Sequence, residues 1–487
     1  MFKSGNIKLF YGAGITYLLG FLYIVLFQGK LFIPYAMLPL ALIVIYMAIF
    51  YTEKLVMCAI FFTPLSITLK ELGLAEGHQS LDLSLPTEPI FAGLLVLGIV
   101  YQINNSFISK KILRHPITII IGIQLLWMFV TTITSEMPVV SVKFLLSRLW
   151  FVCTGFFFMS YLFDKRKNVN LFFALYLIAL CIVIFITTVR HASFGFSEDI
   201  SDWIMTPFYN DHTAYGSAIA MFIPIAFGFL LQSNRSFVQK CLLICALGLL
   251  FTGVYLSSAR AAWLSLVGCV GVLITLLLKI RFRTIVTLIV FLAGVFFVFQ
   301  TQIIIMLNNN TVDSEGNRAD NISSMTNIKT DPSNVERLNR WNSAYRMFEE
   351  RPFVGFGPGT YILQYARFQK DSERTIISNN DGSNGNAHSE YLGPLSEQGL
   401  PGTLIVVSLM LSVFFTGYRL YYSIKERNLK ILVCAIVLGL ATYFIHGFLN
   451  NFLDTDKLAI PFWGFIAALV CIDIYHKNIM ETGQKIS

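Results

Sequence analysis

Long uninterrupted runs of apolar residues recur along this 487-residue chain and restrict it to one class of structure. A helix of about 20 apolar residues is long enough to cross the hydrocarbon core of a bilayer, which is about 30 Å thick. A transmembrane β-barrel would need short segments that alternate between apolar and polar residues, and the run ALYLIALCIVIFITTV at 174–189 shows no such alternation. Only 13% of the residues are charged, whereas soluble domains carry about 25%. The sequence therefore predicts an all-α polytopic membrane protein.

About 12–14 segments qualify as transmembrane helices, and the charges of the loops between them predict their orientation. Alternate loops carry clusters of basic residues, such as Lys110, Lys111 and Arg114. Because basic loops tend to stay in the cytoplasm, we expect both termini there and the polar segment 304–400 on the outer side. The net charge of +8 thus indicates orientation rather than nucleic-acid binding. The third segment is short and could be re-entrant. The fourteen candidates are 8–27, 31–50, 54–69, 88–104, 116–134, 148–163, 170–189, 213–231, 239–257, 260–278, 284–303, 401–418, 430–448 and 458–476.

This pattern divides the chain into three parts. Residues 1–303 form N-terminal transmembrane helices, 304–400 form one large outward-facing loop with short helices, and 401–487 form C-terminal helices and a cytoplasmic tail. Within the loop, an amphipathic helix is expected to begin near Ser333 or Asn334 and to end before Pro352. Its expected apolar face has helical spacing and consists of Val335, Leu338, Trp341, Tyr345 and Phe348.

Arginines on the expected outer side are candidates for binding an anionic substrate. Arg190 ends one span, Arg260 begins another, and Arg337 and Arg340 lie on the amphipathic helix. Positive charge on the outer side opposes the usual orientation bias, and guanidinium groups bind the oxygens of a diphosphate bidentately. The alternative for each arginine is a structural salt bridge or a side chain that reaches from a helix end to the membrane surface.

His388 lies in the segment NAHSEYLGPLSEQGLPG, residues 386–402, just before the next apolar run. A histidine with a pKa near 6.5 can accept a proton at neutral pH, so His388 is a candidate general base. Glu390 and Glu397 are the candidates for orienting its ring, with Glu397 preferred. The alternative is that His388 only caps or packs its segment. The nearby GFGPGT at 355–360 follows a helix end rather than a strand, so its glycines indicate a turn and not a nucleotide site.

Two further absences in the sequence limit the classes of function. No Asp-x-Asp motif or His/Cys cluster is expected to face outward, which predicts chemistry without a metal or other cofactor. Ionisable residues such as Arg148 lie at the ends of the predicted spans rather than at mid-membrane. A proton-coupled transporter normally needs a midplane relay, so this distribution argues against one.

The motifs from about residue 200 to 470 resemble those of the O-antigen ligase and O-antigen polymerase superfamily of bacterial membrane glycosyltransferases. SSARAAW at 257–263 is similar to the family's Ser-Arg-Gly/Ala helix start. ERLNRWNSAYRMFEERPFVGFGPGTY at 336–361 resembles its Arg-Leu-x-x-Trp helix and the Pro-x-x-Gly-x-Gly turn that follows. Residues 386–402 resemble its His-(Asn/Ser)-x-x-Leu block, with Ser389 in place of the commoner Asn. The motifs occur in the order of the family.

The resemblance implies a GT-C-like enzyme of the bacterial inner membrane that works without a metal. Such enzymes transfer a glycan from undecaprenyl diphosphate to an acceptor sugar hydroxyl on the periplasmic face, with inversion. By the same resemblance, Arg260 and Arg337 bind the donor diphosphate and His388 acts on the acceptor. Arg340 competes with Arg337 for its role.

We therefore expect a ligase that uses a lipid A–core acceptor. The alternative within the class is a polymerase that extends a growing glycan. The alternative of another class is a flippase or exporter of lipid-linked saccharide.

Overall fold

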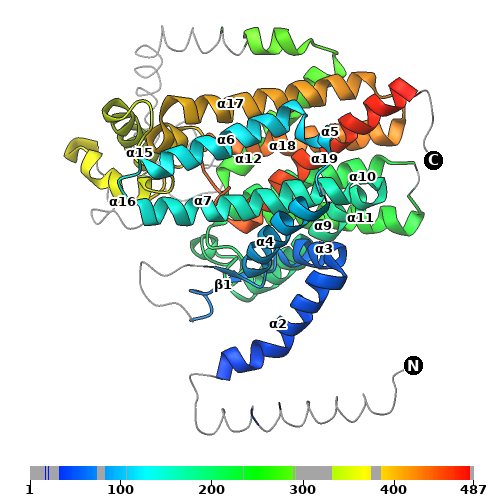
Figure 1. Cartoon of the computed structure of the whole chain (residues 1–487), viewed down its shortest axis with the longest axis horizontal. Coiled ribbons are helices and arrows are strands. Elements are labelled where there is room, and N and C mark those ends of the chain that lie inside the picture. The colour runs from blue at the N-terminus through cyan, green and yellow to red at the C-terminus, as the bar shows by residue number, and fades with distance from the viewer. Residues whose placement is uncertain are drawn as a thin grey trace. The chain divides into compact units, whose positions relative to one another are not determined.

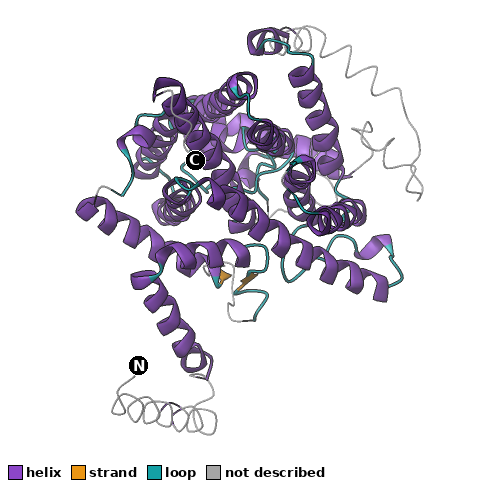
Figure 2. Cartoon of the chain, turned by 90° about the vertical axis from the view of Figure 1, so that its right-hand side faces the viewer, coloured by secondary structure: helices purple, strands orange, loops and turns teal. Residues whose placement is uncertain are grey.

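A computed structural model of the chain describes residues 32–73, 83–105, 107–233, 235–288, 332–373 and 385–482, together with Tyr17, Gly20 and Phe291. These residues belong to two compact units, Met1–Cys58 and Ala59–Ser487. The described part is almost entirely helical (Figures 1 and 2), with one two-stranded antiparallel ribbon of β1 (Ile67–Thr68) and β2 (Ser84–Leu85). The expected all-α fold is confirmed.

The described helices follow the apolar runs of the sequence. Before the large loop they are α2 (Phe32–Phe50), α3 (Thr52–Phe62), α4 (Thr87–Asn105), α5 (Lys110–Leu113), α6 (Pro116–Ile133), α7 (Pro138–Val152), α8 (Met159–Leu162), α9 (Arg166–Ser193), α10 (His212–Leu231), α11 (Phe237–Leu256) and α12 (Arg260–Leu277). In the loop and after it they are α15 (Pro332–Glu350), α16 (Tyr361–Gln364), α17 (Leu392–Ser423), α18 (Arg427–His446) and α19 (Asp456–Thr482). Short helical turns occupy Glu198–Ile200, Tyr365–Phe368 and Asp371–Glu373, and a π-helical turn, Cys153–Phe158, joins α7 to α8.

Ten helices in the described residues are long and apolar enough to cross a membrane, which confirms a polytopic membrane protein. Four of the fourteen predicted segments are not among them. The predicted spans 8–27 and 284–303 lie mostly outside the described residues, and 31–50 corresponds to α2. The segment 54–69 differs from the prediction, because α3 ends at Phe62. With 11 residues it is about 16 Å long and too short to cross the bilayer core.

The second unit is built around α10, α18 and α19. These three helices are 83%, 78% and 83% buried over their apolar windows, whereas the other candidate spans are at most half buried. Close approach of the three depends on small residues such as Gly439 of α18. A Cβ atom there would lie 2.5 Å from the Phe465 ring and 2.7 Å from the Met221 carbonyl oxygen, so only glycine fits. Many outer helices expose large apolar side chains, as expected for surfaces that face lipid.

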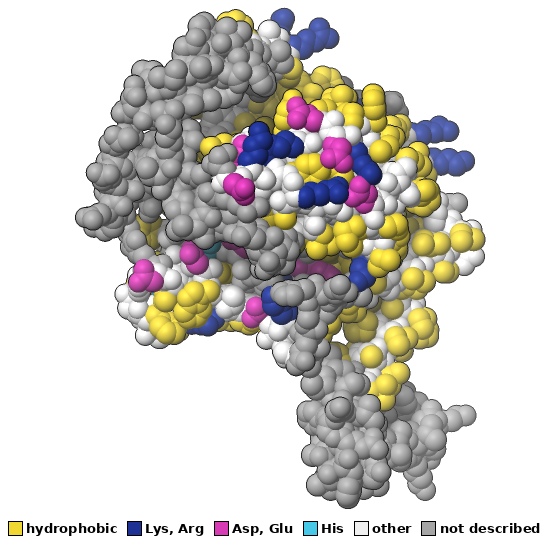
Figure 3. All heavy atoms as spheres, turned by 90° about the vertical axis from the view of Figure 1, so that its left-hand side faces the viewer, with side chains coloured by type: hydrophobic (Ala, Val, Ile, Leu, Met, Phe, Trp, Pro, Cys, Tyr) yellow, Lys and Arg dark blue, Asp and Glu magenta, His cyan; other side chains and the backbone are white. Residues whose placement is uncertain are grey.

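The polar end of the second unit is formed by α15, α16 and the turns around them. α17 packs against both α6 and α15, which places the expected outward loop against the membrane helices (Figure 1). Figure 3 views the unit from this side and shows lysine, arginine and acidic side chains gathered among apolar ones. The division into 1–303, 304–400 and 401–487 stays a prediction. The expected boundary at 400 falls next to Gly399, whose φ of 69° interrupts the helical geometry of α17.

α15 begins at Pro332, one or two residues before the predicted start, and ends before Pro352 as predicted, but it turns a different face inward. Leu338 and Tyr345, which belong to the expected apolar face, are 37% and 52% exposed. The buried face instead contains Ala344 and Met347, which pack in a cluster with Phe356 and Tyr365 of the following turns. Glu336 and Arg340 are also buried on this face, where they form an ion pair one helical turn apart at 2.8 Å. This charge pairing makes the polar face compatible with burial.

Candidate functional site

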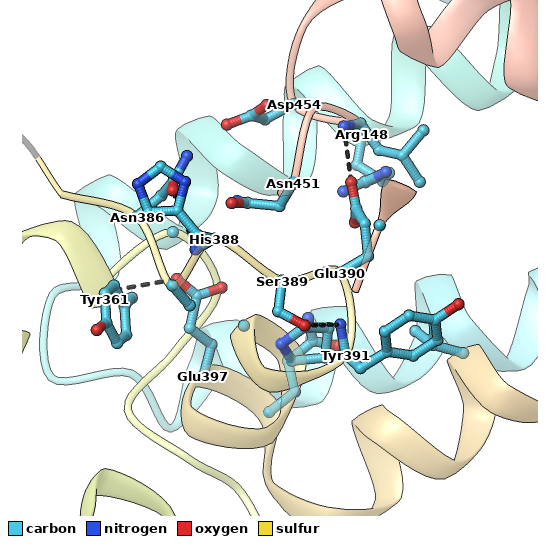
Figure 4. A pocket seen from close by; sticks show the side chains of 18 of the residues that line it. Arg148, Tyr361, Asn386, His388, Ser389, Glu390, Tyr391, Glu397, Asn451 and Asp454 are labelled. Atoms are coloured by element: carbon cyan, nitrogen blue, oxygen red, sulfur yellow. Dashed lines mark hydrogen bonds between the residues drawn. The ribbon is translucent and has the colours of Figure 1, made fainter. Parts of the chain in front are cut away.

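A cavity of about 460 Å³ opens in the second unit beside the histidine segment (Figure 4). Its walls come from α6, α7, α15, α17, α18 and α19 and from the segments that connect them. Aromatic and aliphatic side chains form much of the lining, with polar groups placed among them, as is usual for small-molecule sites. The charged or imidazole side chains among the described lining residues are Arg148, Asp211, Arg340, His388, Glu390, Glu397 and Asp454.

The backbone of His388 is held in an uncommon conformation. Its φ is 45°, in the left-handed region that non-glycine residues seldom adopt. The Asn386 side-chain oxygen accepts a hydrogen bond from the His388 N–H at 3.1 Å, and the Ser389 hydroxyl accepts from the Tyr391 and Leu392 N–H groups at the start of α17, both at 3.3 Å. The polar residues of this segment therefore form a tight turn that points the imidazole into the cavity.

The His388 ring lies between two partners from distant parts of the chain. Its Nε2 is 2.6 Å from Nη1 of Arg340, on α15, and its Nδ1 is 3.3 Å from Oδ1 of Asn450, after α18. A guanidinium group only donates hydrogen bonds, so Nε2 of His388 must be unprotonated. Nδ1 then carries the proton and donates to Asn450. The structure thus defines a neutral His388 whose basic nitrogen faces Arg340.

The surroundings also make His388 a weaker base than the sequence suggested. Burial, followed by the charges of Arg340 and Arg337, lowers the pKa of His388 from 6.5 to about 4. The hydrogen bond with Asn450 and the charge of Asp211 act in the opposite direction. An imidazole with this pKa is almost entirely neutral at pH 7. The expectation of a pKa near 6.5 is therefore wrong for this structure, because the polar loop folds into the protein rather than into water.

Glu390 and Glu397, the two candidates for orienting the imidazole of His388, form their hydrogen bonds with other groups. Oε1 of Glu390 accepts from the Tyr443 hydroxyl at 2.6 Å and from the Phe452 and Leu453 N–H groups at 2.9 and 3.0 Å. Oε1 of Glu397 accepts from the Tyr361 N–H at 3.0 Å (Figure 4). Each glutamate thus ties two segments of the cavity wall together, and Asn450 takes the orienting position. Asn450 was not among the residues expected from the sequence, because a single asparagine in a short polar connection carries no distinctive motif.

The glycine-rich turn 355–360 is the backbone turn that the sequence indicated. Gly355, Gly357 and Gly359 have φ angles of 63°, 110° and 74°. The Gly357 N–H donates to the Glu397 carbonyl oxygen at 2.8 Å, and the Pro358 carbonyl oxygen accepts from the Ser141 hydroxyl at 2.9 Å. The turn is therefore clamped between α17 and the start of α7, where it shapes one wall of the cavity.

The structure separates the four candidate arginines. Arg340 contacts His388, and Arg337 is near enough to act on its charge. Arg260 begins α12 but does not line the cavity, although the next residue, Ala261, adjoins His446. His446 Nε2 is 3.1 Å from Nδ2 of Asn450, so a polar chain connects this helix start to His388.

Arg190 also lies away from the lining and uses its guanidinium group within its own region. It donates to the Thr206 carbonyl oxygen and, at 3.4 Å, to the Ile204 carbonyl oxygen, and it stacks over the Trp203 ring.

Arg148, which the sequence predicted at the end of a span, lies elsewhere in the structure. The helix that carries it runs from Pro138 to Leu162, so Arg148 lies in its interior rather than at its end, and its side chain reaches the cavity. The expectation that ionisable residues avoid the span interiors is therefore wrong here. Asp454 is a second missed residue. With Asp456 it forms an Asp-x-Asp sequence where the connection from α18 enters α19, on the side expected to face outward, so the expectation that no such motif faces outward is wrong. The pKa of Asp454 is raised to about 6 by burial and by the charge of Glu390, against the effect of Arg148.

The described residues contain no group of three or more His, Cys, Asp or Glu side chains arranged to hold a metal ion. In the Asp454–Asp456 sequence, Asp456 is already engaged. Its Oδ2 accepts from the hydroxyls of Ser66 and Thr87 at 2.7 and 2.6 Å, and its Oδ1 is 3.5 Å from the Lys457 ammonium. This pairing of the carboxylate with a cation and two hydroxyls gives it a structural role.

Comparison with known proteins adds one match. A family model described as O-antigen ligase matches residues 245–407. The matched range includes Arg260, α15, the glycine-rich turn and His388, and it ends within the first half of α17. No curated protein matches the sequence. The match covers the residues that carried the resemblance seen in the sequence and confirms it.

Proposed function

We propose that this chain, whose residues 245–407 match the O-antigen ligase family, transfers a glycan from undecaprenyl diphosphate to an acceptor sugar hydroxyl on the periplasmic face of the bacterial inner membrane. The acceptor proposed is the lipid A–core. The observation that carries the proposal is the contact of His388 with Arg340 inside a cavity that the matched region helps to form. A base and an anion-binding group thus meet where a sugar hydroxyl and a diphosphate would react.

The proposed roles follow from the charges. Arg340, Arg337 and Arg260 bind the donor diphosphate and stabilise the negative charge that grows on it as the glycosidic bond breaks. Of Arg337 and Arg340, Arg340 has the more direct role, since it also contacts His388. Arg190 holds the segment around Thr206 and takes a positioning role. Glu397 supports the cavity wall through the turn at Tyr361 rather than through the imidazole.

His388 is proposed to act as the general base. The basic Nε2 accepts a hydrogen bond from Arg340 in the structure, so in this arrangement it is not available to an acceptor hydroxyl. A diphosphate is a stronger acceptor for the guanidinium than a neutral imidazole is. Donor binding would draw Arg340 toward the diphosphate, free Nε2 and, by compensating positive charge, raise the pKa of His388. The hydroxyl then gives its proton to Nε2 and attacks the anomeric carbon from the face opposite the diphosphate, with inversion and without a metal.

The direct test is transfer by the purified protein in lipid nanodiscs, with an undecaprenyl-diphosphate-linked glycan as donor and lipid A–core as acceptor. His388→Gln preserves hydrogen bonding but cannot act as a base, so we expect a folded variant whose rate is about 10²–10⁴-fold lower. Near-normal transfer by this variant would remove His388 from the mechanism.

The cellular test distinguishes the alternatives. Deletion of a ligase leaves lipopolysaccharide without O-chains while the polymer stays on its lipid carrier. Deletion of a polymerase leaves a core with a single repeat unit. A flippase or exporter would move the lipid-linked saccharide without forming a glycosidic bond, and that result would refute the proposed reaction.

A further inference from the structure

One wall of the cavity carries buried polar atoms that the proposed mechanism does not use. Nη1 of Arg148, Nε1 of Trp463 and Oδ1 of Asn451 are buried and have no hydrogen-bond partner among the described residues. Arg148 is 7% exposed and Trp463 is 1% exposed, and all three residues line the cavity. Leaving a buried donor or acceptor without a partner costs about 1–3 kcal/mol. Two unpartnered donors and one unpartnered acceptor in the same lining indicate a ligand that has both hydrogen-bond acceptors and hydrogen-bond donors.

This wall is distinct from the Arg340–His388 pair. Arg148 comes from α7, Trp463 from α19, and Asn451 from the connection between α18 and α19. Figure 4 shows Arg148 well separated from the His388 ring, with Asn451 between them in this view. In an inverting transfer, the nucleophile attacks the anomeric carbon from the face opposite the departing diphosphate. His388, which receives the proton of the acceptor hydroxyl, lines the same cavity, so the Arg148 wall is available to the rest of the acceptor.

The charges near Arg148 favour an uncharged ligand. Arg148 interacts electrostatically with Glu397 and Asp454, and Glu390 also lines the cavity. Two carboxylates, Glu390 and Asp454, thus accompany the guanidinium on this wall, while Arg340 is paired with Glu336. An acidic sugar would add another negative charge beside them, and like charges brought together oppose binding. Aromatic side chains of Tyr391, Tyr443 and Phe462 supply the apolar surface that a sugar ring can pack against.

We propose that Arg148, Asn451 and Trp463 form a subsite that binds a neutral sugar ring of the glycan acceptor through its hydroxyl groups. The proposal rests on the proposed transferase function, and it assigns the subsite a specificity for neutral over acidic sugars. Arg148 donates to a ring or hydroxyl oxygen, the indole N–H of Trp463 donates to another, and the Asn451 carbonyl accepts from a hydroxyl.

Saturation-transfer NMR on the purified protein in nanodiscs measures this binding without any transfer reaction. The probes are methyl glycosides of neutral hexoses and the matching methyl uronates. We expect at least one neutral glycoside to bind, and its uronate to bind more weakly. Added undecaprenyl diphosphate should leave the neutral glycoside bound. Absence of binding by every neutral probe, tighter binding of a uronate, or displacement by undecaprenyl diphosphate would overturn the proposal.

The variants locate the site. Trp463→Phe keeps an aromatic ring at this position but removes the indole N–H donor. We expect it to weaken binding of the neutral glycoside about tenfold, as the loss of one buried hydrogen bond would. Trp150→Phe is the matched control, because its Nε1 is also buried without a partner among the described residues but it does not line the cavity. Equal affinities in these two variants would refute the assignment.

Arg148→Met should also weaken binding, and a thermal melt checks that this variant folds. His388→Gln should bind the glycoside normally while losing transfer. Normal sugar binding by a wild-type protein that transfers nothing would refute the proposed function and leave the subsite standing.

Discussion

Removal of the Arg340 charge is expected to raise the pKa of His388. Lowering this pKa from 6.5 to about 4 disfavours the protonated ring by about 3 kcal/mol. Burial is the larger cause and persists when Arg340 is replaced, so only part of this effect is lost. A like charge in contact typically shifts a pKa by one or more units. We therefore expect a rise of about one unit, which leaves the pKa of His388 still below 6.5.

The variant must also neutralise Glu336, which is 3% exposed and forms an ion pair with Arg340. An unpaired buried carboxylate would destabilise the protein and obscure the effect. The double variant Arg340→Gln/Glu336→Gln avoids this cost, and Glu336→Gln alone is the control. The control leaves the Arg340 charge uncompensated, so it should not raise the pKa of His388.

The measurement is a pH titration of protein labelled with ¹³C at the histidine Cε1 position, in nanodiscs, with the His388 signal assigned by its loss in His388→Gln. The wild-type signal should keep its neutral chemical shift from pH 8 down to about pH 5, because its pKa is about 4. The double variant should begin to titrate at higher pH. A wild-type midpoint near 6.5, or identical titrations of the wild type and the double variant, would refute the reasoning.

The pKa of His388 also determines how the rate of transfer depends on pH. A general base must be neutral, so activity is lost as the pH falls through its pKa. The limb of kcat/KM reports the free enzyme and that of kcat reports the substrate complex. Since bound diphosphate offsets the arginine charges, the acidic limb of kcat should lie at higher pH than that of kcat/KM. Coincident limbs would contradict a donor-dependent release of His388.

Three further predictions concern the cavity wall, the chemistry and the orientation. Gly357→Ala should lower the melting temperature, because φ is 110° and the new Cβ would lie 2.1 Å from the Ser135 hydroxyl oxygen, whereas Gly248→Ala, which meets no atom within 4 Å, should not; equal melting temperatures would disprove the strain. Transfer should persist in excess EDTA, and activity abolished by EDTA and restored by magnesium or manganese would disprove a metal-independent reaction. In a cysteine-free background, a cysteine at position 350 should react with an impermeant reagent from the periplasm and one at 423 only from the cytoplasm; the reverse pattern would invert the proposed topology.

Local sequence determined the helices of this protein and its glycine turn. The apolar runs predicted the ten described candidate spans to within a few residues in most cases, because helix formation depends on neighbours in the chain and on the thickness of the bilayer. The exceptions are the helix that contains Arg148, which begins ten residues before the predicted span at 148, and α17, which begins nine residues before the predicted span at 401. Gly355, Gly357 and Gly359 adopt the positive φ angles for which glycine is suited. The Glu336–Arg340 ion pair on the buried face of α15 does not follow from these local rules, because its burial depends on the segments that pack against the helix.

Only the tertiary structure decided which side chains meet. His388 is held by Arg340 and Asn450, 48 and 62 residues away, and the cavity that His388 and Arg340 line also includes Arg148, on a helix far earlier in the chain. Hydropathy cannot supply these contacts, since lipid is as apolar as a protein interior and a helix can turn either face inward. The same limit explains Leu338 and Tyr345, which are exposed although their spacing predicted a buried face. The pKa of His388 likewise depends on burial and on charges brought close by folding, so its value could not be read from the neighbouring residues in the sequence.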